Sequence, residues 1–509
     1  MTGGEILVVP FFGQGHLFPS MELCKHLASR NFKATLIISS NLTSSIPSSL
    51  RQHPLVEIAE ISASPPMPPP QQPSPESDPL RQHHRHHQQM AIGLEGLLST
   101  RSGTQGSTRP ICAVLDVMMG WSSEIFHKLE VPTVGFFTSG ACAEAMEYAA
   151  WKAHVEDIQP GEVRLVPGLP EDMALTYSDL KRRPHGPPHL QGGGGGGGPP
   201  GAGGPGGPPG FARPPGGGGP RKFGPPRPGE QPPWVNEVEG AIALIINTCD
   251  DLERPFIDYV GHQIGVPVWG VGPLLPEEYW KSADSILRDR EFRPNRQSNY
   301  SEDEVIEWLD SKPRGSVIYV SFGSEVGPSM EEYPKLAAGL EESDRPFVWV
   351  IQRRSSEPGR DQPDSEGYFP HGLDSKVGKR GLIIHGWAPQ LLILSHPSTG
   401  GFVSHCGWNS TVEAIVRGVP FMAWPIRGDQ YYNAKLVVSH LKVGIMVSDG
   451  YPADMVKKED IIKGIEKLVT NEEVKNRAAA LRGKFEHGFP ASSVASLDAF
   501  ADFINQKSC

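Results

Sequence analysis

The sequence lacks long apolar runs, paired cysteines and an excess of positive charge. No stretch reaches the roughly 18 consecutive apolar residues of a membrane helix, so we expect no membrane span. The six cysteines are scattered over 509 residues without a CxxC pair, which is typical of a reducing compartment rather than of a disulfide framework. The formal net charge of −11 argues against a surface that binds nucleic acid.

The N-terminus also lacks the basic region of a signal peptide. Its apolar run, "ILVVPFF", is interrupted by proline and reads as a first β-strand. We therefore expect a cytoplasmic protein.

Glycine and proline are concentrated in residues 184–233. This segment has almost no apolar residue that could offset the entropy of ordering, and its Gly-X-Y period is broken, which disfavours collagen. We expect a disordered insertion, either a tolerated surface loop or a functional flap. The histidine-rich run "RQHHRHHQQ", Arg81 to Gln89, could bind a metal, but no geometry is imposed on it, so we expect no metal site there.

Short runs rich in Val and Ile recur along the rest of the chain, each followed by polar or helical pattern. Such runs, bounded by Gly, Pro or Ser, are typical of buried parallel strands. They form two series: "EILVVPFF", "KATLIISS", "ICAVLDVM", "PTVGFF" and "ALIINT", then "SVIYVSF", "FVWVI", "GLIIHGW", "GGFVSHC" and "PFMAWP". Two such series predict an α/β protein with two doubly wound, Rossmann-like domains.

These series also set the expected domain boundaries. We expect an N-terminal domain over residues 1–272, an interdomain linker over 273–301 and a C-terminal domain over 302–490. A final helix within 491–509 should pack back on the N-terminal domain. A ligand belongs in the cleft at the carboxyl ends of the strands.

The first expected strand leads into a turn that carries His16. The turn has the GxG of a dinucleotide fingerprint, but Phe18 stands where the third glycine would be. His16 is either a general base for a hydroxyl substrate or a helix-capping histidine. Asp116 ends the strand "AVLD" and could orient that imidazole across the cleft. The alternative is an aspartate that caps the next helix.

The segment "GGFVSHCGWNST", Gly400 to Thr411, predicts a strand, a tight turn and a helix start. We expect Gly407 to permit a strained turn, after which free backbone N–H groups and the helix dipole suit a phosphate. His405 would add a donor that strengthens when protonated. No further ligands for zinc appear nearby, and Cys406 should point into the core rather than act as a nucleophile.

Polar and aromatic residues flank this segment. Trp387 follows an expected strand and could stack on a flat heterocycle, although a single tryptophan is more often part of a core. Gln390 and Glu413 could reach ribose hydroxyls, and Asp429 with Gln430 suits vicinal sugar hydroxyls.

From Trp387 to Gln430, this ordered set strongly resembles the signature box of plant family 1 UDP-glycosyltransferases. The segments "GHLFP", "PGLP", "INTCDDLE" and "VSFGS" also look like family landmarks. The resemblance implies a GT-B fold, with two Rossmann-like domains facing across a cleft. It further implies inverting, metal-independent transfer of a sugar, with glucose expected, from a UDP-sugar to a small lipophilic acceptor.

The resemblance also assigns roles to residues at matching positions. His16 is the base and Asp116 its partner, and Trp387 stacks on uracil, next to Ala388. Gln390 and Glu413 lie at the ribose. The diphosphate is held by His405, Asn409, Ser410 and Ser324, and the sugar is lined by Asp429, Gln430, Trp408 and Thr138. UDP-glucose is then the donor substrate; no cofactor is implied, and no DxD motif is present.

The acceptor is left open by these residues. The default is a phenolic hydroxyl, for instance of a flavonoid, in a monomeric enzyme. The alternatives are transfer to an aromatic carbon and a UDP-sugar-binding protein without transfer activity. A hydrolase would need a GxSxG elbow, which is lacking, and the incomplete fingerprint disfavours a nicotinamide enzyme.

Overall fold

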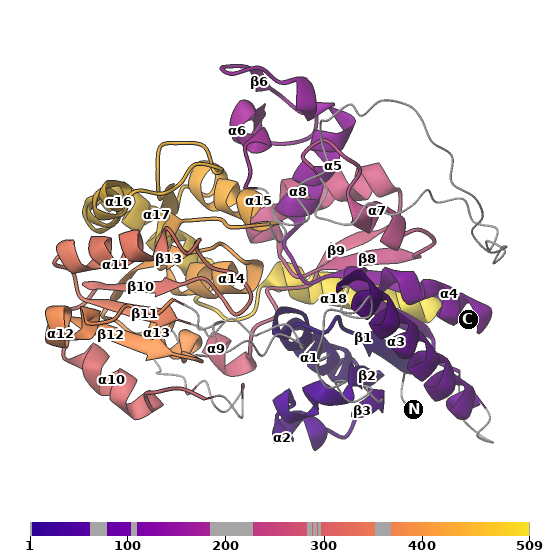
Figure 1. The fold of residues 1–509 in the computed structure, drawn as a ribbon. Coiled ribbons are helices and arrows are strands. Elements are labelled where there is room, and N and C mark those ends of the chain that lie inside the picture. The colour runs from indigo at the N-terminus through magenta and orange to yellow at the C-terminus, as the bar shows by residue number, and fades with distance from the viewer. Residues whose placement is uncertain are drawn as a thin grey trace, which may run out of the picture.

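The computed structural model describes residues 3–61, 79–102, 109–183, 227–281, 288, 293, 297–351 and 368–507; of residues 79–88 and 102 it describes the backbone alone. Two parallel β-sheets, each flanked by helices, form two lobes that lie side by side in Figure 1. We call them the N-terminal lobe and the C-terminal lobe.

The N-terminal lobe is built on a sheet in the order β3-β2-β1-β4-β5-β8-β9, in which all neighbours are parallel. The strands are β1 (Glu5–Val9), β2 (Lys33–Ser39), β3 (Val56–Ile61), β4 (Cys112–Asp116), β5 (Thr133–Phe137), β8 (Ala243–Ile246) and β9 (Val268–Gly270). The central strands β1, β4, β5 and β8 are buried throughout because helices cover both faces.

The helices of this lobe connect successive strands. They are α1 (Gln14–Ser29), α2 (Ser48–Arg51), α3 (Pro79–Ser102), α4 (Ser123–Lys128), α5 (Ala141–Lys152), α6 (Tyr177–Leu180), α7 (Pro233–Glu237) and α8 (Asp250–Ile264). A short antiparallel pair, β6 (Val163–Arg164) and β7 (Leu175–Thr176), lies outside the main sheet.

The C-terminal lobe has a second parallel sheet, in the order β12-β11-β10-β13-β14-β15. Its strands are β10 (Val317–Ser321), β11 (Phe347–Ile351), β12 (Gly381–His385), β13 (Thr399–Ser404), β14 (Phe421–Ala423) and β15 (Gly444–Met446). In both sheets the first strand is central and the order reverses beside it. The prediction of two doubly wound, Rossmann-like domains is therefore confirmed.

Helices again cover the faces of this sheet. They are α10 (Glu302–Asp310), α11 (Tyr333–Glu342), α12 (Leu373–Val377), α13 (Gln390–Ser395), α14 (Trp408–Arg417), α15 (Gln430–Lys435), α16 (Lys458–Thr470) and α17 (Glu472–Gly483). Helix α10 begins after Ser301 because of a capping box: Ser301 Oγ accepts from Glu304 N, and the Glu304 carboxylate accepts from Ser301 N.

Several segments of the described chain join the lobes. The connection after β9 contains α9 (Glu277–Lys281), whose Tyr279 is fully buried and donates to the Glu413 carbonyl oxygen at 2.8 Å. The last helix, α18 (Ala491–Lys507), drawn in yellow in Figure 1, packs on β9 and α1 of the N-terminal lobe. The segment around α6 reaches the C-terminal lobe, where Arg183 makes a two-pronged ion pair with the buried Glu332.

Two expectations concern segments that the structure describes only in part. Of the Gly/Pro-rich segment 184–233, residues 184–226 lie outside the described residues, whereas 227–233 are described and Pro233 is the first residue of α7. The histidine-rich run Arg81–Gln89 forms part of helix α3. Its side chains before Gln89 lie outside the described part of the chain.

Cysteines within the described parts of the chain are buried and unpaired: Cys24, Cys112, Cys142, Cys249 and Cys406. Burial raises the pKa of the Cys112 thiol to about 12. Along the same parts of the chain, the helices are all too short or too polar to cross a bilayer.

Candidate active site

The N-terminal half of the site forms where β1 and β4 end side by side. His16 is in the first turn of α1, and Asp116 is the last residue of β4, which pairs with β1. His16 Nδ1 lies 2.7 Å from Asp116 Oδ2, and Asp116 Oδ1 accepts from Met118 N at 2.9 Å. The aspartate therefore both orients the imidazole and caps the following 3₁₀ helix. Both interpretations of Asp116, as the partner of His16 and as a helix cap, agree with the structure.

Thr138 is a second neighbour of the same nitrogen. It follows β5, the strand next to β4, and its Oγ1 lies 2.9 Å from His16 Nδ1. An ionised carboxylate can only accept, which places the ring proton on Nδ1 and leaves the lone pair on Nε2. Thr138 thus contacts the imidazole itself, a contact that the sequence did not predict.

Burial and charge act in opposite directions on His16. Burial lowers its pKa, but the attraction and hydrogen bond of Asp116, with smaller contributions from Glu325 and Asp429, raise it above the ordinary value. Its side chain is still 24% exposed. The ring is thus stabilised as a cation after it takes up a proton, which suits a general base.

The C-terminal half forms at the turn between β13 and α14. The strained residue is Cys406, with φ +62°, and not Gly407, whose φ of −59° is ordinary; the prediction about Gly407 was wrong. The conformation of Cys406 is held on both sides, because its N–H donates to Ser404 Oγ and its carbonyl accepts from Asn433 Nδ2. Its thiol is buried, and burial raises its pKa, so Cys406 is not a nucleophile.

Gly407 has a steric role instead. A Cβ at this position would lie 2.4 Å from His405 Nε2, and a Cβ on Gly323 would lie 2.8 Å from the same atom. The two glycines therefore leave room for the His405 ring between β10 and α14.

His405 is neutral at physiological pH. Burial lowers its pKa to about 4, assisted by the positive charge of Arg427 and opposed by a backbone interaction with Ser321. That protonation strengthens this donor stays a prediction, because the ring takes up a proton only well below physiological pH. Among the described residues, its buried Nδ1 has no hydrogen-bond partner. The His405 ring stands beside Gly407, the residue before α14, where an anion would meet the positive end of that helix.

Gln390, Ser410 and Glu413 lie together on the C-terminal lobe. Gln390 Nε2 donates to Ser410 Oγ at 2.9 Å and to Glu413 Oε2 at 2.6 Å, and Gln390 Oε1 accepts from Tyr319 OH at 3.0 Å. Arg293 contacts Glu413 Oε1 at 2.5 Å. The residues expected at the ribose thus lie together, and their side chains are hydrogen-bonded to one another.

Trp387 and Ala388 precede this network in the chain. Ala388 is buried, and Trp387 is half-buried, with its backbone N–H donating to the Gln297 carbonyl at 2.9 Å. The guanidinium carbon of Arg293 lies 5.8 Å from the centroid of the Trp387 ring.

Trp408 and Asn409 contact the N-terminal lobe. Trp408 is 4% exposed, and its indole N–H donates to the Asn247 carbonyl at 2.6 Å. Asn409 Nδ2 donates to the Gly15 carbonyl at 2.9 Å, beside His16. Both side chains thus make contacts between the lobes. The Asn409 contact joins the N-termini of α1 and α14.

The remaining expected residues lie in turns after β10 and β14. Asp429 Oδ2 accepts from Asn433 Nδ2 at 2.8 Å, and burial raises the pKa of Asp429. Gln430 Oε1 is used by the backbone N–H groups of Ile426 and Arg427, at 3.0 and 2.9 Å. Ser324 is exposed in the turn after β10.

Several neighbours of these residues were not foreseen. Glu325 pairs with Arg427 at 2.7 Å, and a Cβ on Gly13 would lie 3.2 Å from Glu325 Oε1, so this ion pair stands beside the turn before His16. Arg293 was missed because its surroundings in the sequence are polar and without period. Glu325 directly follows the "SFGS" segment, so its place beside the site could have been suspected.

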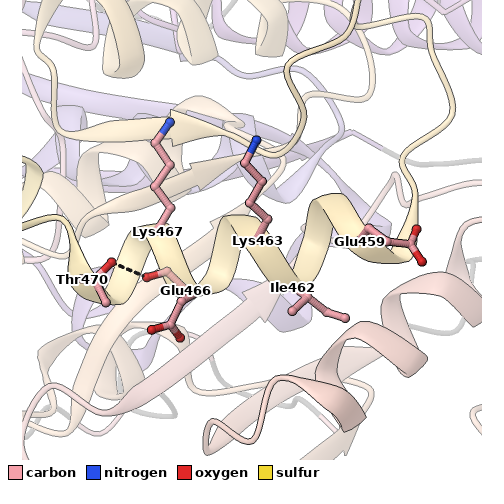
Figure 2. A pocket seen from close by; sticks show the side chains of 6 residues that line it. All are labelled: Glu459, Ile462, Lys463, Glu466, Lys467 and Thr470. Carbon is pink, nitrogen blue, oxygen red and sulfur yellow. Dashed lines mark hydrogen bonds between the residues drawn. The ribbon is translucent and has the colours of Figure 1, made fainter.

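A separate depression lies along α16. Glu459, Ile462, Lys463, Glu466, Lys467 and Thr470 line it, and Figure 2 shows the two lysines pointing to one side of the helix and Ile462 and Glu466 to the other. All six residues belong to one helix, and the candidate site residues take no part in it.

Comparisons with known proteins indicate the family of the chain. A family profile described as "UDP-glucoronosyl and UDP-glucosyl transferase" matches residues 295–490. UDP-glucosyl transferase 73M2 of Saponaria officinalis is 32% identical over 74% of this chain and 70% of its own length. The anthocyanin 3'-O-beta-glucosyltransferase of Gentiana triflora is 28% identical over 94% of this chain and 93% of its own.

Solved structures extend the likeness to the fold. UGT73P12 of Glycyrrhiza uralensis has a TM-score of 0.73 at 22% identity, covering 99% of this chain and 96% of that one. UGT71G1 of Medicago truncatula, complexed with UDP-glucose, has a TM-score of 0.70 at 22% identity, covering 99% and 98%. The two lobes therefore have the GT-B arrangement.

Proposed function

The chain belongs to the family of UDP-glucuronosyl and UDP-glucosyl transferases, and from this premise we propose that it transfers glucose from UDP-glucose to a phenolic hydroxyl. Transfer proceeds with inversion at the anomeric carbon and without a metal ion. The observation that carries the proposal is the facing arrangement of a His–Asp pair on α1 and β4 and an anion-binding helix start on α14, joined by the Asn409–Gly15 contact.

In this mechanism His16 Nε2 takes the proton of the acceptor hydroxyl. The acceptor oxygen forms a bond to the anomeric carbon from the face opposite UDP, while the bond between that carbon and the diphosphate oxygen breaks and its electron pair leaves with UDP. Asp116 stabilises the imidazolium that results.

The leaving diphosphate is stabilised by groups of the C-terminal lobe. The N-terminus of α14 supplies backbone N–H groups and the positive end of the helix dipole, and the His405 ring beside Gly407 supplies a polar contact. These groups take the electrostatic role that a metal ion has in other transferases, which supports the proposal of a metal-independent reaction.

The acceptor class is proposed from the relatives' names. Besides the Gentiana triflora enzyme, a scopoletin glucosyltransferase of Nicotiana tabacum is 27% identical over 93% of this chain and 91% of its own. We therefore place a flavonoid-type phenol first among the acceptors.

The test is incubation with UDP-glucose and a panel of phenols, steroids and terpenoids, with EDTA present in a parallel series. The expected product gains one hexose, is acid-labile, carries a β-linkage by its anomeric proton coupling, and forms equally well with EDTA. Acid-stable products would indicate transfer to carbon instead. UDP-glucose binding without product from any acceptor would contradict catalysis, and loss of product in EDTA would contradict metal independence.

A further inference from the structure

Thr138 stands at the end of β5 with its hydroxyl oxygen against the imidazole of His16. It directly follows β5, which pairs with β4 through Asp116 and Phe136. The residue is 7% exposed, and its carbonyl oxygen accepts from Asn247 Nδ2 at 3.3 Å. The sheet and a buried amide therefore fix the position of Thr138.

Two oxygens from neighbouring strands approach one nitrogen of the ring. Asp116 Oδ2 lies 2.7 Å from His16 Nδ1, and Thr138 Oγ1 lies 2.9 Å from the same atom. An ionised carboxylate can only accept, so Nδ1 carries the proton. With that proton in place, Thr138 Oγ1 accepts as well, and the Nδ1–H group is shared between the two oxygens in a three-centre hydrogen bond.

Other states of the ring lose contacts with these oxygens. Turning the ring over about χ2, which has two broad minima, would bring the carbon Cδ2 to face both of them. Moving the proton to Nε2 would set the Nδ1 lone pair against the Asp116 carboxylate and remove the lone pair that a base needs. The state that satisfies both oxygens is thus the one in which Nε2 of His16 has a lone pair.

We propose that Thr138 is a positioning residue for the general base: together with Asp116, its hydroxyl oxygen holds the His16 ring so that Nε2 can take the proton of the acceptor. The inference rests on the proposed function, which makes His16 the base. It gives Thr138 a role beyond the sugar contact that the family resemblance implies. Because the imidazole contact uses a lone pair of Oγ1, the hydroxyl proton remains available to the sugar, and the two roles are compatible.

The test is steady-state kinetics of full-length Thr138→Val, which keeps the shape of the side chain and removes the oxygen. We expect kcat to fall by about three- to tenfold, as for one lost hydrogen bond. The Kd for UDP, measured by calorimetry, should equal that of the wild type, because UDP carries no sugar to contact this residue.

The acidity of the acceptor separates positioning of the base from contact with the sugar. A base contributes less when the acceptor hydroxyl is already ionised, because no proton is left to take. The comparison uses two phenols that the wild type accepts, one unsubstituted and one a nitrophenol that is ionised at the pH of the assay. The loss of kcat in Thr138→Val should be several-fold with the first and small with the nitrophenol. A loss at least as large with the nitrophenol, or no loss with either phenol, would overturn the inference.

Three further variants frame this result. Thr138→Ser keeps the oxygen and should restore most of kcat; a serine variant as slow as Thr138→Val would also overturn the inference. Thr138→Ala removes the oxygen and serves if Thr138→Val does not fold. Thr133→Val is the matched control, because Thr133 lies on β5, is 2% exposed and has its Oγ1 3.2 Å from another histidine nitrogen, His127 Nε2. Its kcat should equal that of the wild type.

His16→Ala separates this inference from the proposed function. If the wild type transfers no sugar, the proposed function fails. If His16→Ala keeps full turnover, the base assignment fails and the inference falls with it. If His16→Ala is slow while Thr138→Val matches the wild type, only the role of Thr138 is refuted.

Discussion

Two histidines lie beyond the ends of central strands, His16 in the first turn of α1 and His405 directly after β13, and their environments shift their pKa values in opposite directions. His16 has a carboxylate at 2.7 Å, and its pKa is raised although burial opposes this. His405 is more deeply buried, lies near the cation Arg427 and has a pKa lowered to about 4.

The difference separates two chemical roles within one residue type. Above its raised pKa, His16 is a neutral imidazole that is ready to become a cation, which is what a general base does. With its pKa lowered to about 4, His405 is neutral near pH 7, where it acts as a fixed polar contact. His16 and His405 are the same residue type, and the nearby charges and the degree of burial determine what each can do.

The largest effect should come from removing the base. We expect His16→Ala to lower turnover by about 10²–10⁴-fold, because proton transfer by a positioned base contributes that much. UDP binding, measured by calorimetry, should be unchanged. His262→Ala, which changes an exposed histidine on α8, is the control. Full turnover by His16→Ala would show that another group is the base.

The next effect should come from removing the charge beside it. Asp116→Asn should lower the rate by about ten- to hundredfold, since orientation and cation stabilisation are both weakened. In the wild type the rate should rise with pH to a plateau, with a midpoint above the ordinary histidine pKa, because His16 must lose its proton to act. In Asp116→Asn the midpoint of the pH–rate profile should move to lower pH. A midpoint that stays in place would mean that the profile reports another group.

A smaller effect is expected on the other side of the comparison. His405→Phe keeps a ring and removes the polar nitrogens, so the Kd for UDP should rise by about tenfold, as for a lost hydrogen bond to a charged group. Because the pKa of His405 is about 4, the loss should be equal at pH 6 and pH 8. A loss confined to pH 6 would show that His405 is charged there.

The smallest effect concerns the space around that ring. A Cβ on Gly407 would lie 2.4 Å from His405 Nε2, so Gly407→Ala must displace the ring. We expect a rise of about threefold in the Kd for UDP with little change in the midpoint of thermal unfolding. Gly483→Ala, where a Cβ meets nothing within 4 Å, is the matched control. Equal behaviour of the two variants would mean that the ring position does not matter for binding.

The interior strands of both sheets and one edge strand, β12, could be predicted from the sequence, and the other three edge strands could not. The strands found from apolar runs include all those buried on both faces. The missed strands β3, β9 and β15 are at sheet edges, as the strand order shows. Strand β3 mixes buried and exposed positions, and β9 and β15 are only three residues long. An edge strand needs fewer apolar residues, so its sequence carries a weaker pattern.

For the site, the sequence predicted one contact, between His16 and Asp116, but not the contacts that depend on how the lobes pack. Adjacent strand ends predicted that His16 and Asp116 would meet, because their positions follow from the fold. Asn409 and Trp408 were expected at the donor, yet they bind Gly15 and Asn247 of the other lobe. How two lobes sit together depends on long-range packing, which no local pattern records. The lowered pKa of His405 was not predicted for the same reason, since burial is a property of the assembled fold.

The buried cysteines have a practical consequence. A thiol reacts as the thiolate, so groups with raised pKa values inside packed elements are protected from alkylating reagents until the surrounding structure opens. Cys24 lies on α1, eight residues after His16, and Cys406 directly follows His405. Their labelling rates would therefore time the local opening of each half separately, without any added cysteine. Cys24 and Cys406 are thus native probes of local opening, Cys24 for the helix that carries the base and Cys406 for the turn at the donor.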